Sequence, residues 1–236
     1  MIARRITELR RSLADDRGHT MSELVTTMFL LGVVLVIVVS LFTGFSHAFT
    51  EDRSASTSAR TANIGMNELT RVVRTGTENP VSGQTLNNPV FEFAGKEKIV
   101  LYAYLDTDSA SPKPVKVQFS VNANRELVET RWTSYVLSPG YFAFNAVAAS
   151  TRVVARKIVN NITGDPYLFT FYRGDGTQVL TPSGTSSLTL DERRQIVAVQ
   201  VFMKVQADPT ARAEPVTLQN TVGIPNLGVS RVGLGS

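Results

Sequence analysis

The chain has 236 residues, of which 43% are hydrophobic and 19% are charged, and this size suits one modest globular domain together with an anchor. It contains no cysteine, which excludes disulfides, thiolate metal sites and a cysteine nucleophile. The formal net charge is +4, and half of it lies in residues 1–18, where five arginines accompany three acids, so the basic balance does not indicate a nucleic-acid-binding face.

The first predicted element after this basic segment is a membrane-spanning helix. Residues 24–50 contain no Asp, Glu, Lys or Arg, and the apolar stretch from Leu24 to Phe45 has about the 20 residues that a helix needs to cross a bilayer. This stretch is longer than the apolar region of a secretory signal peptide, which has about 7–15 residues. Because arginines precede it, we expect a single-pass protein of the plasma (inner) membrane with a cytoplasmic N-terminus and an extracytoplasmic C-terminus.

A carboxylate, Glu23, stands at the edge of this span, after Gly18. An ionisable group in this position is costly without a partner, so it indicates a functional site. One candidate partner is the α-amine that a cut after Gly18 would create, because a free amine is largely protonated at neutral pH. The alternative is that Glu23 is solvated among the lipid headgroups.

The motif around this carboxylate is Gly18-His19-Thr20-Met21-Ser22-Glu23-Leu24, and it lies between a basic segment and an apolar helix. It resembles the cleavage and methylation signal of type IV prepilins and type II secretion pseudopilins. In that family a prepilin peptidase cuts after the glycine and methylates the new N-terminus. The resemblance implies that residues 1–18 are a cleaved cytoplasmic leader and that His19 becomes the methylated N-terminus. It also implies that Glu23 sets the register of assembly by neutralising the amine of a neighbouring subunit.

The helix is expected to continue beyond the span as an amphipathic stalk. Apolar residues recur at spacings of four and three, which predicts a seam that packs on a partner, formed by Ala55, Ala59, Ala62, Met66, Leu69 and Val73. The residues expected to face water are Arg53, Arg60, Asn67, Glu68, Arg71 and Arg74. A stop signal follows at Gly76 and Pro80, so we expect the helix to end near Thr75 and assign residues 19–75 to the transmembrane and stalk helix.

Residues 76–236 are predicted to form a β-rich extracytoplasmic head. Strict alternation in Val115–Val121, turn residues and a returning segment at 127–132 predict a hairpin. Valines at alternate positions predict a central strand at 197–205. Further strands are expected at 99–105, 141–144, 152–159, 168–172 and 216–222, with a turn at 174–176, loops at 77–90 and 206–215, and a glycine-rich tail at 223–236.

The predicted fold class is therefore α+β, with a long N-terminal transmembrane and amphipathic α-helix packed on a C-terminal antiparallel β-rich head. This layout resembles the larger minor pilins and the J-type pseudopilins. The shared features include a helix that ends in a segment like 67–74 and two late strands like 196–205 and 216–222.

Side chains that could carry catalysis or bind a metal are sparse. The two histidines, His19 and His47, both lie in or beside the anchor, which argues against Ser-His-Asp chemistry in the head. Asp106-Thr107-Asp108 begins like a calcium loop, but Val117 stands where such a loop needs an acid. Basic residues that could bind DNA are explained equally by solvated strand edges, namely Arg152, Arg156, Lys157, Arg193 and Arg194. We expect no catalytic residue, no metal, no cofactor and no nucleic-acid partner.

The sequence thus predicts a structural subunit and not an enzyme. The resemblance implies a minor pilin or pseudopilin that is assembled into, or primes, a type IV pilus-like filament serving motility, adhesion, DNA uptake or secretion. The expected partners are a prepilin peptidase, other pilin or pseudopilin subunits, an inner-membrane assembly platform and membrane lipid. Two alternatives are a signal-anchored extracytoplasmic binding module that does not polymerise and a membrane-tethered hydrolase that works with carboxylates alone, such as a glycosidase.

Overall fold

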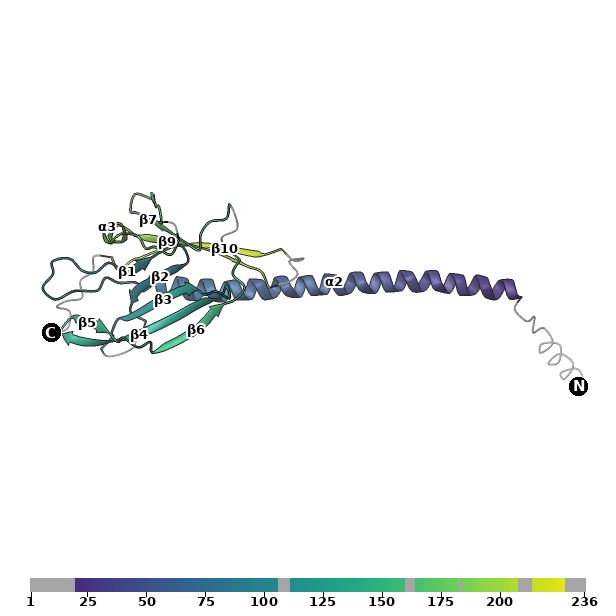
Figure 1. The fold of residues 1–236 in the computed structure, drawn as a ribbon, viewed down its shortest axis with the longest axis horizontal. Coiled ribbons are helices and arrows are strands. Elements are labelled where there is room, and N and C mark those ends of the chain that lie inside the picture. The colour runs from purple at the N-terminus through teal and green to yellow at the C-terminus, as the bar shows by residue number, and fades with distance from the viewer. Residues whose placement is uncertain (1–19, 106–110, 160–163, 183, 208–213, 228–236) are drawn as a thin grey trace, which may run out of the picture. The chain divides into compact units, whose positions relative to one another are not determined.

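The computed structural model describes residues 20–105, 111–159, 164–182, 184–207 and 214–227 (Figure 1). They divide into two compact units, one that ends at Thr50 and one that begins at Glu51. The fold class is α+β, with a long apolar helix near the N-terminus and an antiparallel β domain after it, as predicted.

The long helix α2 extends over Met21–Arg74, which confirms the predicted helix to within a few residues. At its start, the backbone N–H groups of Glu23 and Leu24 donate to the carbonyl of Thr20 over 2.9 and 3.1 Å. At its end, the N–H of Gly76 donates to the carbonyl of Val73 over 3.0 Å, so the predicted stop at Gly76 is confirmed. The helix ends where a side chain would not fit, because a Cβ at Gly76 would lie 2.8 Å from Val90.

From Glu51 onward, α2 buries one face against the β domain. The predicted seam is confirmed, because Ala62, Met66, Leu69 and Val73 are buried and the two preceding alanines are half-buried. Gly65 is also buried in this face, and a Cβ placed there would lie 2.9 Å from the Cβ of Ala155 and 3.0 Å from the Cε of Met203. Those two neighbours belong to different sheets, so the glycine lets the helix backbone approach both of them closely.

The first sheet has six antiparallel strands, which are β1 (Phe91–Ala94), β2 (Lys98–Ala103), β3 (Val115–Val121), β4 (Leu127–Ser138), β5 (Tyr141–Phe144) and β6 (Ser150–Ala155). Strands β1 to β5 are neighbours in chain order, and β6 pairs with β4. The predicted hairpin is confirmed, since Val121 pairs with Leu127 and the register continues to Val115 and Thr133. The strand predicted at 141–144 is confirmed as β5, and the strand predicted at 99–105 is confirmed as β2, although β2 ends two residues earlier, at Ala103. Strand β1 was missed.

The strand predicted at 152–159 is wrong at its C-terminal end, because β6 stops at Ala155. Two residues later Lys157 has φ of 61°, a left-handed conformation that an extended strand does not allow. Ile158 then forms an isolated antiparallel bridge with Val205 of the other sheet. The chain therefore leaves the first sheet at Ala155 and reaches the second at Ile158.

The second sheet has four antiparallel strands in the order β10 (Val216–Gly223), β9 (Ala198–Val205), β7 (Phe169–Tyr172) and β8 (Gln178–Val179). The predicted central strand is confirmed, because β9 lies between β10 and β7, and its alternate residues Val199, Val201, Met203 and Val205 are buried. The strands predicted at 168–172 and 216–222 are likewise confirmed, as is the turn at 174–176, where Gly176 has φ of 80°.

Two short elements of this part were missed, β8 and the helix α3 (Leu190–Arg194). The helix is held by a capping box in which Thr189 accepts from the N–H of Glu192 and the carboxylate of Glu192 accepts from the N–H of Thr189. No strand lies between 77 and 90, as predicted. Residues 208–213 of the predicted loop and 228–236 of the predicted tail lie outside the described residues.

The two sheets and the second half of α2 share one hydrophobic core. Phe91 of the first sheet and Phe171 of the second have ring centroids 5.8 Å apart in an edge-to-face arrangement. Leu69 and Val72 of the helix are fully buried in the same cluster of side chains. The helix is therefore a component of the core of the β domain from Glu51 onward.

Candidate functional site

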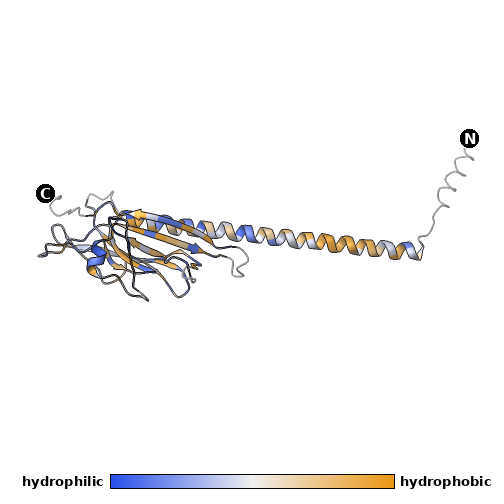
Figure 2. Ribbon diagram, turned by 90° about the horizontal axis from the view of Figure 1, so that it is seen from above, coloured by the Kyte–Doolittle hydropathy of each residue, from blue (hydrophilic) through white to orange (hydrophobic). Residues whose placement is uncertain are grey.

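The first part of the candidate site is the apolar half of α2, residues 21–50, in which every residue is exposed. Among the described residues, α2 is the one helix that is long and apolar enough to cross a membrane (Figure 2). Its exposed side chains include Phe29, Leu31, Phe42 and Phe49, each at least 69% exposed. A continuous apolar surface of this size is unfavourable in water, so it requires lipid or partner helices.

The threonine hydroxyls within this stretch bond to the backbone of the helix itself. The hydroxyls of Thr26 and Thr27 donate to the carbonyls of Ser22 and Leu24 over 2.8 and 2.9 Å. The hydroxyl of Thr43 donates to the carbonyl of Val39 over 3.0 Å in the same way. Because hydrocarbon offers no hydrogen-bond partners, internal bonding of this kind is what a span requires of its polar groups.

Glu23 lies in the first turn of α2, at the polar end of the apolar stretch. Its backbone N–H also donates to the Oγ1 of Thr20 over 3.4 Å, and the pattern Thr20-Met21-Ser22-Glu23 fits the S/T-x-x-E signature of a capping box. A carboxylate in a first turn also interacts favourably with the helix dipole. The pattern and the position of Glu23 therefore favour a local role at the start of the helix, in addition to the role predicted from the sequence. Gly18 and His19 lie outside the described residues.

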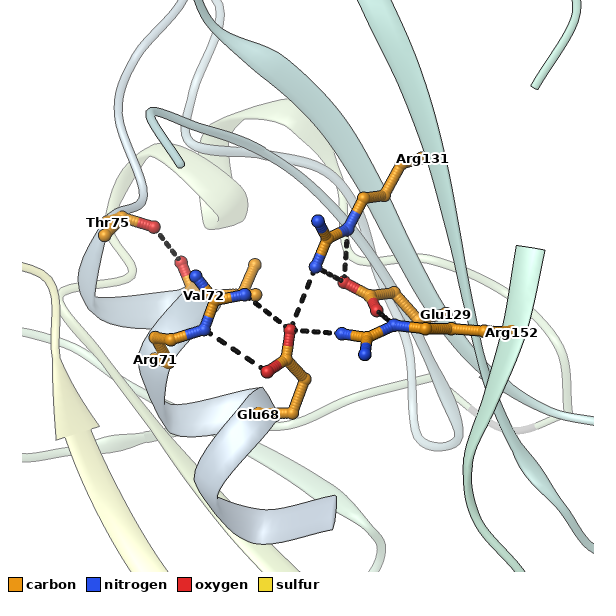
Figure 3. Close-up of polar contacts among 7 residues, drawn as sticks. All are labelled: Glu68, Arg71, Val72, Thr75, Glu129, Arg131 and Arg152. Atoms are coloured by element: carbon orange, nitrogen blue, oxygen red, sulfur yellow. Dashed lines mark hydrogen bonds and ion pairs between the residues drawn. The ribbon is translucent and has the colours of Figure 1, made fainter. Parts of the chain in front are cut away.

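The second part of the candidate site joins α2 to the first sheet and is shown in Figure 3. We call it the arginine–glutamate cluster, and its members are Glu68, Arg71, Glu129, Arg131 and Arg152. The prediction that Glu68 faces water is wrong, because its side chain is only 16% exposed. Its Oε1 lies 2.6, 2.9 and 2.6 Å from the Nη2 atoms of the three arginines, in chain order.

The other acid of the cluster, Glu129 on β4, has a fully buried side chain. Its Oε1 accepts a hydrogen bond from the Nε of Arg131 over 2.7 Å, and its Oε2 accepts one from the Nε of Arg152. A buried carboxylate is tolerated only when it is paired in this way. Arg131 and Arg152 each contact both acids, so the cluster connects the helix to β4 and β6.

The surroundings of Glu68 act on its ionisation in opposite directions. Partial burial disfavours the charged carboxylate, whereas the hydrogen bond from Arg71 and the charges of Arg71, Arg152 and Arg131 favour it. The arginines outweigh burial, and the pKa of Glu68 is lowered below its ordinary value. The carboxylate therefore stays ionised in the folded protein to a lower pH than in the unfolded chain.

A pH-dependent contribution to stability follows from this shift. A lowered pKa means that the stabilisation by Glu68 is complete above the unfolded-state pKa of about 4.3 and is lost as pH falls through the folded-state pKa. We expect Glu68→Gln to lower the free energy of unfolding by about 1–3 kcal/mol at pH 7. At a pH below the folded-state pKa of Glu68 we expect little effect, because the carboxyl group is then protonated in the wild type as well. Denaturant titrations from pH 7 downward, followed by the fluorescence of Trp132, measure both quantities. The control is Glu51→Gln, because Glu51 is exposed. If Glu68→Gln lowered the free energy of unfolding equally at neutral and at acid pH, the pH-dependent contribution of Glu68 would be contradicted.

Four of the five basic residues singled out in the sequence make contacts within the domain. Arg156 contacts Glu126 over 3.0 Å, and Arg194 lies 3.7 Å from Asp191. Arg193 donates to the backbone carbonyls of Phe91 and Glu92. Arg152 does lie on a strand that pairs on one side only, as expected, but it is also a member of the arginine–glutamate cluster.

No group of three or more His, Cys, Asp or Glu side chains that could hold a metal ion occurs within the described ranges. The calcium-loop candidate at 106–108 lies outside them. No family model matches the sequence, and no significant match was found among curated proteins.

Proposed function

We propose that the chain is a minor pilin or pseudopilin subunit that is processed after Gly18 and assembled into, or primes, a type IV pilus-like filament. The observation that carries the proposal is the combination at the start of α2. A carboxylate, Glu23, occupies the first turn of a helix whose following apolar half is entirely exposed, and the leader motif ends five residues before it.

The proposed step begins with removal of residues 1–18, which leaves a positively charged amine at His19. In the membrane the apolar half of α2 is covered by lipid, and in a filament it is covered by the same surface of other subunits. Transfer between two apolar environments costs little hydrophobic free energy, so a specific interaction must select the register. An amine and a carboxylate about 4 Å apart attract each other by about 4 kcal/mol at an effective dielectric constant near 20.

This ion pair discriminates between registers because of what a misplaced subunit would lose. A subunit shifted along the bundle leaves both its amine and the Glu23 of its neighbour without a counter-charge in a poorly hydrated environment. Breaking such a pair costs several kcal/mol. In this proposal Glu23 selects the register. The apolar side chains around the helix stabilise the bundle of helices but do not favour one axial position over another.

The arginine–glutamate cluster supplies the second requirement of a filament subunit, which is that the head stays attached to the helix. Glu68 and Arg71 belong to α2, whereas Glu129, Arg131 and Arg152 belong to β4 and β6. Because α2 is also part of the core, movement of the helix into a filament would carry the β domain with it. In this proposal the N-terminus starts in the cytoplasm and the β domain is extracytoplasmic, and the partners are a prepilin peptidase, other subunits, the assembly platform and lipid.

The variant Gly18→Val tests the assigned cleavage site. We expect it to abolish processing in a host that has a prepilin peptidase, because the peptidase requires a glycine before the cut in the family that the motif resembles. The intact mass of the membrane-extracted protein measures whether residues 1–18 remain. The matched control is Gly44→Val, since a Cβ at Gly44 meets no atom within 4 Å and the change lies within the span. Mature protein in the Gly18→Val sample would refute the site, and an intact leader in the wild type would favour a non-polymerising anchored module.

A further inference from the structure

The β domain contains a cavity where the turn between β1 and β2 meets the segment that precedes β7. Its volume is about 400 Å³, which lies within the range of small-ligand sites, about 300–1,000 Å³. None of the functions considered above uses this cavity. The lining residues that decide its chemistry are Phe93, Lys96, Glu97, Lys98, Ser120 and Tyr167.

Two lysines of the cavity hold their ammonium groups over aromatic rings. The Nζ of Lys96 lies 4.0 Å from the ring centroid of Tyr167, and the Nζ of Lys98 lies 4.9 Å from that of Phe93. Both lysines are half-buried, and among the described residues no ion pair joins either of them to an acid. Because an ammonium has three N–H donors and a ring face accepts them only weakly, both groups can still donate to an anion.

The backbone fixes the place of both lysines. The carbonyl of Lys96 accepts a hydrogen bond from the N–H of Phe169 in β7 over 3.1 Å. Lys98 pairs with Ser120 of β3, so these two side chains lie side by side on one face of the sheet. The hydroxyl of Ser120 accepts from the Nε2 of Gln118 over 3.2 Å, which leaves its own hydrogen for a ligand.

The one acid among these lining residues is already neutralised. The two carboxylate oxygens of Glu97 lie 2.8 and 3.1 Å from the Nη1 of Arg125. Three cations therefore meet one acid at the cavity, which leaves an excess of two positive charges. Half-buried cations are partly shielded from water, so an anion in the cavity would supply interactions that solvent supplies only in part.

We propose that this cavity binds a phosphomonoester group. Such a group carries a charge of about −1.5 to −2 at pH 7, which matches the excess of two positive charges, whereas a carboxylate carries a single charge. Its oxygens are strong acceptors and complement the donors of Lys96, Lys98 and Ser120. The inference does not depend on assembly into a filament, because the β domain of a single chain contains the whole cavity.

Binding can be measured with the full-length protein in phosphatidylcholine nanodiscs, from the broadening of the phosphorus NMR signal of phenyl phosphate. We expect saturable binding with a dissociation constant of about 1 mM. Benzoate has the same ring but a single charge, and we expect it to displace phenyl phosphate only at higher concentrations.

The lipid composition of the nanodiscs distinguishes two sources of the group. Phosphatidic acid is a phosphomonoester, whereas phosphatidylglycerol is a diester. If phosphatidic acid weakens the binding of phenyl phosphate and phosphatidylglycerol does not, the site takes a lipid headgroup. If neither lipid weakens it, the site takes a soluble phosphomonoester.

Two variants test whether binding occurs in the cavity. Lys96→Met and Lys98→Met keep an apolar chain against the ring but remove the charge, so we expect each to weaken binding about tenfold. The matched control is Lys113→Met, which changes the net charge equally at an exposed lysine that does not line the cavity. The proposal is overturned if phenyl phosphate does not saturate, if both cavity variants bind as the wild type does, if the control variant is weakened as much as they are, or if benzoate binds more tightly than phenyl phosphate.

Discussion

Replacing Glu129 with alanine is expected to lower the free energy of unfolding of the β domain by about 3–5 kcal/mol. The side chain of Glu129 is fully buried, and it separates two arginines that lie on neighbouring strands. Without the carboxylate, Arg131 and Arg152 lose one of the two acids that they share, and the remaining acid, Glu68, faces three arginines alone. Denaturant unfolding followed by Trp132, which lies on the same strand, measures the loss.

Two further variants separate burial of the charge from a general effect of removing an acid. Glu129→Gln keeps the shape and one acceptor but removes the charge, so we expect a loss between those of the wild type and the alanine variant. Asp191→Ala is the control, because the side chain of Asp191 is 87% exposed and its contact with Arg194 is long. Exposed ion pairs contribute about 0–1 kcal/mol. A loss below about 1 kcal/mol for Glu129→Ala would show that the buried ion pairs of Glu129 contribute no more than exposed ones do.

Replacing Glu23 with alanine is expected to reduce incorporation into filaments at least tenfold while leaving membrane insertion and cleavage intact. The physical reason is the loss of the charge that selects the register, because about 1.4 kcal/mol already corresponds to a tenfold change in an equilibrium. The ratio of filament-associated to membrane-associated protein, measured after shearing and quantitative immunoblotting, gives the result.

The local structure around Glu23 provides a sharper comparison. In the S/T-x-x-E pattern that residues 20–23 fit, the acid is a hydrogen-bond acceptor; alanine removes both this acceptor and the charge, whereas glutamine also occurs at this position and removes the charge alone. If the charge sets the register, Glu23→Gln and Glu23→Ala are equally defective. If Glu23→Gln assembles normally, Glu23 serves the start of the helix, and the proposed ion pair is wrong. Ser22→Ala, in the same turn, is the control and is expected to assemble as the wild type does.

Much of the fold could be predicted from the sequence because its signals are periodic. Alternation in 115–121 and 197–205 gave strands whose bounds match β3 and β9 to within one residue. The spacing of apolar residues in 55–73 gave the buried face of α2, since a helix that packs on a sheet must present its apolar residues at that spacing. The glycine at 76 marked the end of the helix correctly.

The failures concern interactions between segments distant in the chain. Glu68 was assigned to water as a charged residue outside the apolar seam, and only the tertiary fold brings Arg131 and Arg152 to it. The end of β6 depends on the left-handed conformation of Lys157, which residue type did not indicate. One signal was present but unused, since Glu129 shares its strand face with Leu127, and an acid on an inward face requires a counter-charge.

The most direct test of the proposed function is the N-terminus of the wild-type protein. The chain is expressed in a host with a prepilin peptidase, extracted from the membrane and analysed by intact mass and N-terminal sequencing. We expect a chain that begins at His19 and carries a methyl group on its α-amine. A chain that still begins at Met1 and retains residues 1–18 would contradict the proposal.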